Sequence, residues 1–323
     1  MPGSTVRHRR NAQENVRELD RTFDLIVCTG VLHHLPDPDR GLRALHDVLR
    51  PKGAMQLMVH APYGRAGIYM MQRFCRMLRT EASPDDLSDL NDLIDGLSPE
   101  HPMTRLLSKT EEFSQPQAIA DALLHPRDRA FTVPELYAWL KRAGMSLGRF
   151  IEQAPYLPQC GDLANSSYSK RLNALPMPDQ HAAAELFRGT MTQHHLIAYR
   201  DDYGSCEQSI HFTGQQWRDY VPIRLPWTLC IRDGVPPGAT AVLFNPAHKH
   251  RDLLLPLTWA QDHLLGAIDG ARTLGEIVTA CGTTKGAQRA LQFFEQLYRY
   301  DQIVFDASIT ATRTPLDRPE VAP

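Results

Sequence analysis

The sequence predicts an α/β protein: an incomplete doubly wound sheet that carries a helical insertion, followed by a smaller α+β domain. Three observations support this fold class. An apolar run at 23–28, a helical pattern and a second apolar run at 54–60 follow one another as a strand–helix–strand unit. Helix-then-strand patterns recur at 131–150 and 182–200. After about residue 210, short strand-like pieces lie among prolines and give way to helices.

Length and charge leave room for two domains and indicate no general polyanion binding. The chain has 323 residues, and domains usually have about 100–200 residues each. Its 35 basic and 37 acidic side chains give a net charge of −2, so no overall positive field attracts nucleic acid or an acidic membrane. We therefore expect neither of these partners.

The cysteines and the hydropathy pattern predict a cytoplasmic protein. Six cysteines are scattered without a CxxC pair, which is typical of reduced thiols. No apolar run reaches the roughly 20 residues that a membrane-spanning helix needs. The basic first ten residues lead into a polar segment, unlike a secretory signal.

The elements of the first part follow from local signals. FDLIVC, at 23–28, is a continuous apolar run of the kind found in strands covered on both faces. In the segment GLRALHDVLR, Leu42, Leu45 and Val48 recur at helical spacing, and proline and glycine in RPKG end that helix. Thr132 and Glu135 form a capping-box pattern at the start of a later helix.

These signals divide the chain into domains. Thr273 and Glu276 repeat the capping-box pattern in the C-terminal part, where three helices and a strand are expected. The predicted divisions are an N-terminal arm (1–22), a partial α/β domain (23–200) with a helical insertion or lid (80–128), a linker (201–210), a small α+β domain (211–307) and a disordered tail (308–323).

The segment DLIVCTGVLHHLPDP, followed by a helix, LRPKG and a strand, resembles the class I S-adenosylmethionine-dependent methyltransferases. In that family it corresponds to the fourth strand, the next helix and the fifth strand of a Rossmann-like sheet. The resemblance implies S-adenosylmethionine as cofactor and methyl transfer to an unidentified small-molecule, peptide or protein acceptor. Ligands of such sheets bind beyond the carboxyl ends of the strands.

The resemblance places the cofactor's methionine part beside Cys28, Thr29, Gly30 and Leu32, where Gly30 allows close approach because it lacks a Cβ. His33 and His34 are then candidate catalytic bases on the acceptor side. Adjacent side chains do not easily face one site, so we expect one of them to belong to a turn or helix cap. Methyl transfer mainly needs in-line positioning, and a base is optional.

Further candidates are open to alternative interpretations. Tyr63 and Arg65, in APYGRAG, either contact substrate or belong to a glycine-rich turn that caps a helix. The loop HPRDRAF, at 125–131, is either a substrate loop or, the better prediction, a surface turn. His194 and His195 fit strand packing, and we predict no metal site because no acidic or cysteine partners lie at ligand spacing.

The sequence departs from the family before Phe23. The segment 1–22 contains one glycine, Gly3, and no GxGxG turn. We therefore expect a truncated sequence with an impaired cofactor site and an apolar strand edge that another segment or a partner chain covers. The alternative is a non-catalytic interaction protein built on a methyltransferase remnant. The segment LLGAIDGARTLGEIV also resembles, weakly, the winged-helix pattern of PqqD-like domains; a helical bundle is an equal alternative.

Overall fold

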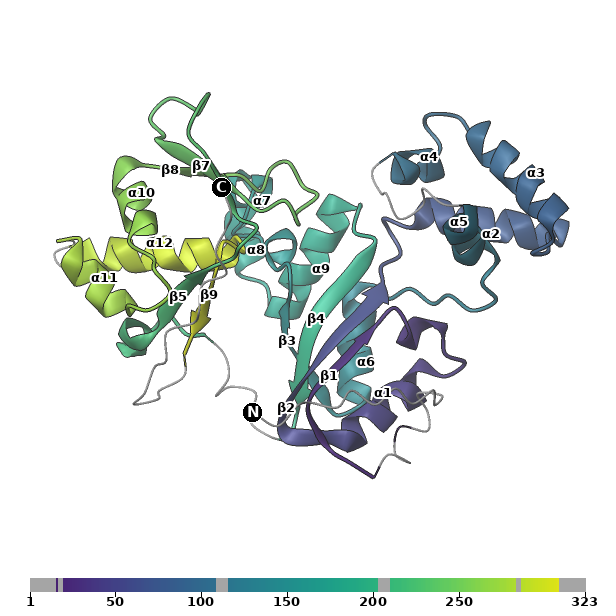
Figure 1. Ribbon diagram of the computed structural model, residues 1–323, viewed down its shortest axis with the longest axis horizontal. Coiled ribbons are helices and arrows are strands. Elements are labelled where there is room, and N and C mark those ends of the chain that lie inside the picture. The colour runs from purple at the N-terminus through teal and green to yellow at the C-terminus, as the bar shows by residue number, and fades with distance from the viewer. Residues whose placement is uncertain (1–15, 17–19, 109–115, 203–209, 283–285, 308–323) are drawn as a thin grey trace, which may run out of the picture. The chain divides into compact units, whose positions relative to one another are not determined.

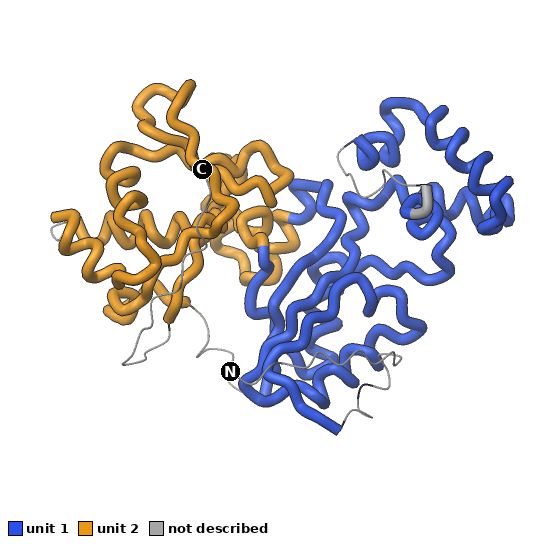
Figure 2. The backbone as a smooth tube through the Cα atoms, viewed as in Figure 1, with its two compact units in different colours: residues 1–151, 185–205 blue, residues 152–184, 206–323 orange. Residues whose placement is uncertain are grey.

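The computed structural model describes residue 16 and residues 20–108, 116–202, 210–282 and 286–307 (Figure 1). The predicted tail at 308–323, nearly all of the arm at 1–22 and most of the linker at 201–210 lie outside the described residues. The chain forms two compact units, shown in Figure 2. Unit 1 comprises 1–151 and 185–205, and unit 2 comprises 152–184 and 206–323.

Unit 1 is built on a mixed four-stranded sheet with the order β1-β2-β4-β3. β1 and β2 are parallel, whereas β4 runs antiparallel to both of its neighbours, β2 and β3. The sheet confirms the predicted α/β class and the βαβ unit. Its strands are β1 (Phe23–Thr29), β2 (Leu49–His60), β3 (Met145–Phe150) and β4 (Gln193–Arg200).

Two capped helices, α1 (Pro38–Val48) and α6 (Val133–Arg142), accompany the sheet. The Asp37 side chain accepts a hydrogen bond from the Arg40 N–H at 2.9 Å and so satisfies one free donor at the start of α1. The capping box of Thr132 and Glu135 at α6 is confirmed. Each of the two helices therefore begins directly after its capping residue, which is Asp37 for α1 and Thr132 for α6.

The prediction that β1 is covered on both faces is wrong. Leu25 and Val27 are 59% and 58% exposed, whereas Cys28 is buried. Alternate strand residues share one face, so an apolar face of β1 is open among the described residues. The continuous apolar run indicated a strand correctly, but local composition does not determine which other elements cover it.

Unit 1 also contains a group of helices that lie together in Figure 1. Their shared core includes Ile68, Met71, Leu90 and Met103. The predicted insertion at 80–128 stays a prediction. A Cβ at residue 67 would lie 2.3 Å from the backbone nitrogen of Met103. The helix that begins at Ala66 and the helix that begins at Pro102 can therefore lie this close together only because residue 67 is a glycine. The helices are α2 (Ala66–Leu78), α3 (Pro84–Asp95), α4 (Pro102–Leu107) and α5 (Pro116–Leu124).

Unit 2 is an α+β unit with its own core around Phe294 and Leu243. The three C-terminal helices, the following strand and the capping box of Thr273 are confirmed. Its elements are α7 (Asp162–Asn165), α8 (Ser169–Asn173), β5 (Val221–Arg224), β6 (Leu229–Ile231), β7 (Ala241–Phe244), β8 (Leu255–Leu257), α10 (Trp259–Gly266), α11 (Leu274–Ala280), α12 (Ala287–Arg299) and β9 (Ile303–Asp306). Helix α9 (Met177–Arg188) runs from unit 2 into unit 1.

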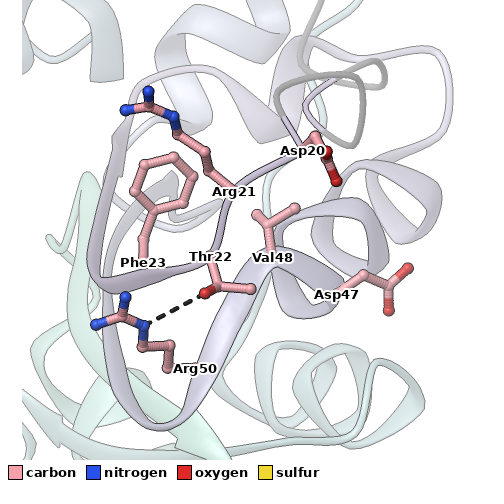
Figure 3. A pocket seen from close by; sticks show the side chains of 7 residues that line it. All are labelled: Asp20, Arg21, Thr22, Phe23, Asp47, Val48 and Arg50. Atoms are coloured by element: carbon pink, nitrogen blue, oxygen red, sulfur yellow. Dashed lines mark hydrogen bonds between the residues drawn. The ribbon is translucent and has the colours of Figure 1, made fainter.

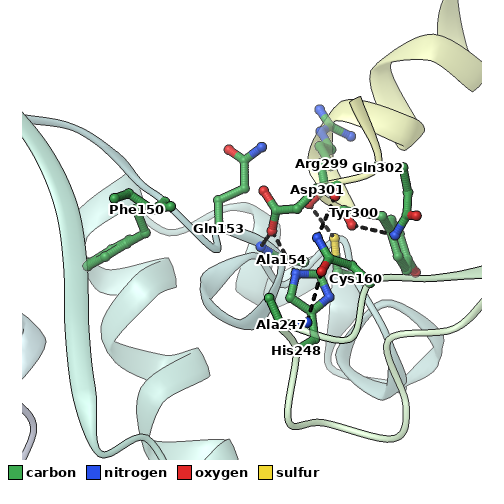
Figure 4. A network of polar contacts seen from close by, with 12 residues as sticks. Phe150, Gln153, Ala154, Cys160, Ala247, His248, Arg299, Tyr300, Asp301 and Gln302 are labelled. Atoms are coloured by element: carbon green, nitrogen blue, oxygen red, sulfur yellow. Dashed lines mark hydrogen bonds and ion pairs between the residues drawn. The ribbon is translucent and has the colours of Figure 1, made fainter. Parts of the chain in front are cut away.

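A buried polar network attaches the segment after β3 to the C-terminal part of unit 2 (Figure 4). One carboxylate oxygen of Asp301 accepts a hydrogen bond from the Ala154 N–H at 2.8 Å and lies 2.9 Å from Nε2 of His248. The Tyr300 hydroxyl accepts a hydrogen bond from the Gly161 N–H at 3.0 Å. These contacts explain why residues from 152 onward belong to unit 2.

Within the described ranges, no helix combines the length and the apolar character that crossing a bilayer requires. Five cysteines lie in those ranges, and none of them forms a disulfide bond there: Cys28, Cys75, Cys160, Cys230 and Cys281. The cytoplasmic location stays a prediction.

Candidate active site

The carboxyl ends of β1 and β2 lie side by side and bring the predicted cofactor residues into one turn. Thr29 pairs with Met58, and the next N–H, of Gly30, donates to the Met58 carbonyl at 3.3 Å. Gly30 has a φ of +73°, a conformation that favours glycine. Cys28 and Leu32 are buried, and Thr29 is exposed. Their contact with a cofactor stays a prediction.

The chain then forms a 3₁₀ turn, Leu32–His34, that directs two histidines toward a third. The ring centroids of His33 and His34 are 4.1 Å apart, and that of His33 lies 3.8 Å from that of His60, the last residue of β2. His33 is fully buried, whereas His34 is partly exposed. Both histidines belong to this turn, as expected for at least one of them. Contrary to the expectation from their adjacency, both rings also lie in one cluster.

The loop 125–131 bridges the ends of both strands. The Arg129 N–H donates to the His33 carbonyl at 3.1 Å, and the Phe131 N–H donates to the His60 carbonyl at 2.9 Å. These bonds place Asp128 against His60, with 2.8 Å between Oδ1 and Nδ1. The Asp128 side chain is 2% exposed. The predicted surface turn with an ion pair is right for Arg127 and Arg129, which are exposed, and wrong for Asp128, whose buried carboxylate belongs to the cluster.

Helix α2 supplies the remaining partners of Asp128. Oδ2 of this residue accepts a hydrogen bond from the Gln72 amide at 3.2 Å and lies 3.5 Å from Nη2 of Arg65. Arg65 is buried and precedes the first residue of α2, whereas Tyr63 is exposed. A Cβ at Gly64 would lie 2.4 Å from the Met191 carbonyl oxygen, so Gly64 has a packing role that positions Arg65.

Burial and mutual contact set the charge of the cluster. Burial, together with the neighbouring imidazoles, lowers the pKa of His33 to about 3, and burial also lowers the pKa of His60. Burial alone would raise the pKa of Asp128, but the hydrogen bond with His60 and nearby positive charge lower that pKa to about 2. Near neutral pH, His33 and His60 are therefore neutral and Asp128 is ionised.

A pocket at the opposite end of β1 is a weaker candidate for a cofactor site (Figure 3). Nε of Arg50 donates to the Thr22 hydroxyl at 3.3 Å across it. The pocket lies at the amino end of β1, whereas α/β sheets bind ligands at the carboxyl ends. Its lining residues are Asp20, Arg21, Thr22, Phe23, Asp47, Val48 and Arg50.

Sequence reasoning omitted His60 from its candidates and considered Asp128 only as part of the loop 125–131. His60 carries a usable signal, because it ends the strand beside the proposed cofactor turn. Asp128 lies 68 residues further along in a loop, and no local pattern links it to His60. The strand histidines are placed as packing predicts: Nε2 of His194 lies 2.8 Å from the Phe131 carbonyl oxygen and 3.3 Å from a Glu185 carboxylate oxygen.

The mixed sheet and the site at its carboxyl edge define a Rossmann-like methyltransferase fold. In agreement with this, residues 2–144 match a family described as a methyltransferase domain. Residues 2–144 are thus similar to a methyltransferase domain, and the fold agrees with this similarity. The apparent truncation and the PqqD-like similarity stay predictions.

Two solved structures of PKMT2 from Rickettsia typhi are similar in fold. One has a TM-score of 0.60 at 13% identity, and the second, a complex with AdoHcy, has a TM-score of 0.58 at 12% identity. Each alignment covers 91% of this chain and 60% of the other chain.

An uncharacterised protein of Synechococcus sp. is 28% identical over 207 residues, which are 61% of this chain and 50% of the relative. The chain thus spans about half the length of this curated relative.

Proposed function

We propose that the chain takes part in the transfer of a methyl group from S-adenosylmethionine, with the cofactor's methionine end beside Gly30 and Leu32. The observation that carries the proposal is the tight turn at the carboxyl end of β1, where Gly30 leaves the backbone approachable. The methyltransferase-domain match and the AdoHcy complex of the fold relative support it.

The histidine–aspartate cluster forms the acceptor side in this proposal. His34 is partly exposed, and its Nδ1 donates to the Arg127 carbonyl at 2.8 Å, so its ring orientation is fixed. Arg65 and Asp128 supply fixed charges beside it. We assign these residues to positioning of the acceptor, with proton removal by His33 or His34 only where the acceptor requires it. The acceptor is a small molecule, a peptide or a protein.

Calorimetry with S-adenosylhomocysteine tests cofactor binding. We expect Gly30→Ala to weaken binding of S-adenosylhomocysteine at least tenfold. The added Cβ would lie where the cofactor is proposed to contact the protein backbone, and a φ of +73° is strained for alanine. Gly238→Ala is the matched control: its φ is +85°, and a Cβ there meets no atom within 4 Å. Equal affinity of the two variants would contradict the assignment of the turn.

We further propose that cofactor binding by this chain alone is weak, because segment 1–22 offers no glycine-rich turn ahead of β1. A version with added upstream sequence that supplies such a turn is the comparison. Binding of S-adenosylhomocysteine that is equally tight in both versions would overturn this part of the proposal and leave the family assignment intact.

The alternative function, a non-catalytic interaction protein, is favoured by one observation: the open apolar face of β1 at Leu25 and Val27. It predicts a stable complex or oligomer whose formation ignores S-adenosylhomocysteine. Size-exclusion chromatography of the wild type and of Leu25→Ser/Val27→Ser, with and without that ligand, discriminates the two functions.

A further inference from the structure

The rings of His33, His34 and His60 form a compact nitrogen-rich group beside Asp128. One potential ligand atom from each of these four residues lies within 4.8 Å of the corresponding atoms of the others, the one such grouping in the described part of the chain. The four residues come from three separate segments, and backbone hydrogen bonds from the loop 125–131 to His33 and His60 hold these segments together. The grouping is therefore a product of the fold and is built from rigid elements.

The hydrogen bonds of the rings leave lone pairs available. His34 and His60 each place Nδ1 2.8 Å from an acceptor oxygen, the Arg127 carbonyl and the Asp128 carboxylate respectively. A neutral ring that donates from Nδ1 keeps its lone pair on Nε2. Donation to a carboxylate or carbonyl is the arrangement that commonly orients metal-binding histidines.

His33 supplies the second, independent observation. It is 0% exposed, and neither of its ring nitrogens has a hydrogen-bond partner among the described residues. A buried polar group without a hydrogen-bond partner is costly, so a structure rarely keeps one without a ligand or a water. A neutral imidazole carries a lone pair on one of its two ring nitrogens. On a buried ring next to two further imidazoles, this free lone pair points to a bound species that accepts it.

We propose that His33, His34 and His60, with Asp128 as the compensating and orienting carboxylate, bind a divalent transition-metal ion of the Zn²⁺ type. Imidazole nitrogens suit such ions, whereas Mg²⁺ and Ca²⁺ prefer oxygen ligands. Arg65 contacts Oδ2 of Asp128, and Oδ1 is directed toward the histidines.

The metal site does not depend on the proposed methyl transfer, but the two are adjacent. If the methyl-transfer proposal holds, a metal ion here supplies a Lewis acid on the acceptor side. Metal binding by the protein without cofactor, and binding of S-adenosylhomocysteine by the metal-free protein, are separate measurements. The failure of one proposal is therefore distinguishable from the failure of the other.

Titration of the purified, chelator-treated chain with Co²⁺, followed by its visible absorption and by competition with Zn²⁺, tests the site. We expect one equivalent to bind, His33→Ala and His60→Gln to abolish saturable binding, and Asp128→Asn to weaken it about 10- to 100-fold. His181→Gln is the matched control, because His181 is a buried histidine of unit 2. The His181→Gln variant should bind Co²⁺ like the wild type.

Circular dichroism checks that each variant is folded. If His60→Gln fails this check, His34→Gln replaces it, because the His34 ring is partly exposed and its loss is better tolerated. No saturable binding by the wild type would overturn the proposal and leave a buried water as the partner of His33. Binding that persists unchanged in folded cluster variants would overturn it as well.

Discussion

The two units each bury a histidine–aspartate pair, and the two pairs serve different purposes. In unit 1, His60 and Asp128 are 2.8 Å apart, and in unit 2, His248 and Asp301 are 2.9 Å apart. All four side chains are at most 9% exposed. Distance and burial alone therefore do not distinguish them.

Their neighbours do distinguish them. Besides His248, the Asp301 carboxylate contacts the main chain, because it accepts a hydrogen bond from the Ala154 N–H at 2.8 Å. Asp128 instead contacts side chains, and two further imidazoles surround its histidine. A buried pair whose partners are backbone groups stabilises a fold. A pair with additional imidazole nitrogens beside it has capacity left for a ligand.

The largest effect on stability is expected in unit 2. Asp301→Ala leaves the Ala154 N–H and His248 without their buried acceptor, which should lower the free energy of unfolding by about 3–5 kcal/mol. Denaturant unfolding measures it. Asp233→Ala, at an exposed position of the same unit, is the control. A loss at Asp301 no larger than that at Asp233 would refute the structural role of the pair.

The second largest effect is expected in the pH dependence of the stability of unit 2. Burial lowers the pKa of His181 to about 4, below its ordinary value of 6.5. The unfolded chain therefore takes up a proton that the folded chain excludes, and stability falls as the pH drops from 6.5 toward 4, by at most about 3 kcal/mol. Unfolding curves of the wild type and His181→Gln across this range test it; parallel losses in both proteins would assign the effect to other groups.

Packing at Gly64 should have a smaller effect on stability but a clear effect on the cluster. Gly64→Ala forces a Cβ against the Met191 backbone, which should cost about 1–3 kcal/mol and displace Arg65 from Asp128. Thermal unfolding measures the cost, and the Co²⁺ titration measures the displacement. Gly238→Ala, in open space, should leave Co²⁺ binding unaltered. A Co²⁺ titration of Gly64→Ala that matches that of the wild type would show that Arg65 does not contribute to the metal site.

The capping boxes should show the smallest effects. Thr132→Ala in unit 1 and Thr273→Ala in unit 2 each remove a side chain that accepts an N–H at a helix start. Each should lower the free energy of unfolding by about 1 kcal/mol. Chemical denaturation followed by circular dichroism measures the loss, and Thr→Ser at the same positions should restore most of it. Losses well above 2 kcal/mol would show contacts beyond the cap.

The sequence by itself determined the elements and half of the site. The capping boxes, the helix around Leu42 and Leu45 and the apolar strands depend on neighbouring residues, so local patterns predicted them. The predicted helix stop at RPKG is wrong, because the helix ends at Val48 and RPKG lies in β2. The same local segment, with the family resemblance, pointed to Gly30, His33 and His34 as candidates. Each of these signals lies within a few residues of the feature that it predicts.

Only the tertiary structure decided which faces are covered and which side chains meet. The apolar run of β1 predicted burial, yet Leu25 and Val27 are exposed, because coverage depends on distant elements. The contact between His60 and Asp128 joins residues 68 positions apart through a loop that bonds to two strand ends. Such a pairing produces no periodic pattern in the sequence, and it forms only when the chain folds.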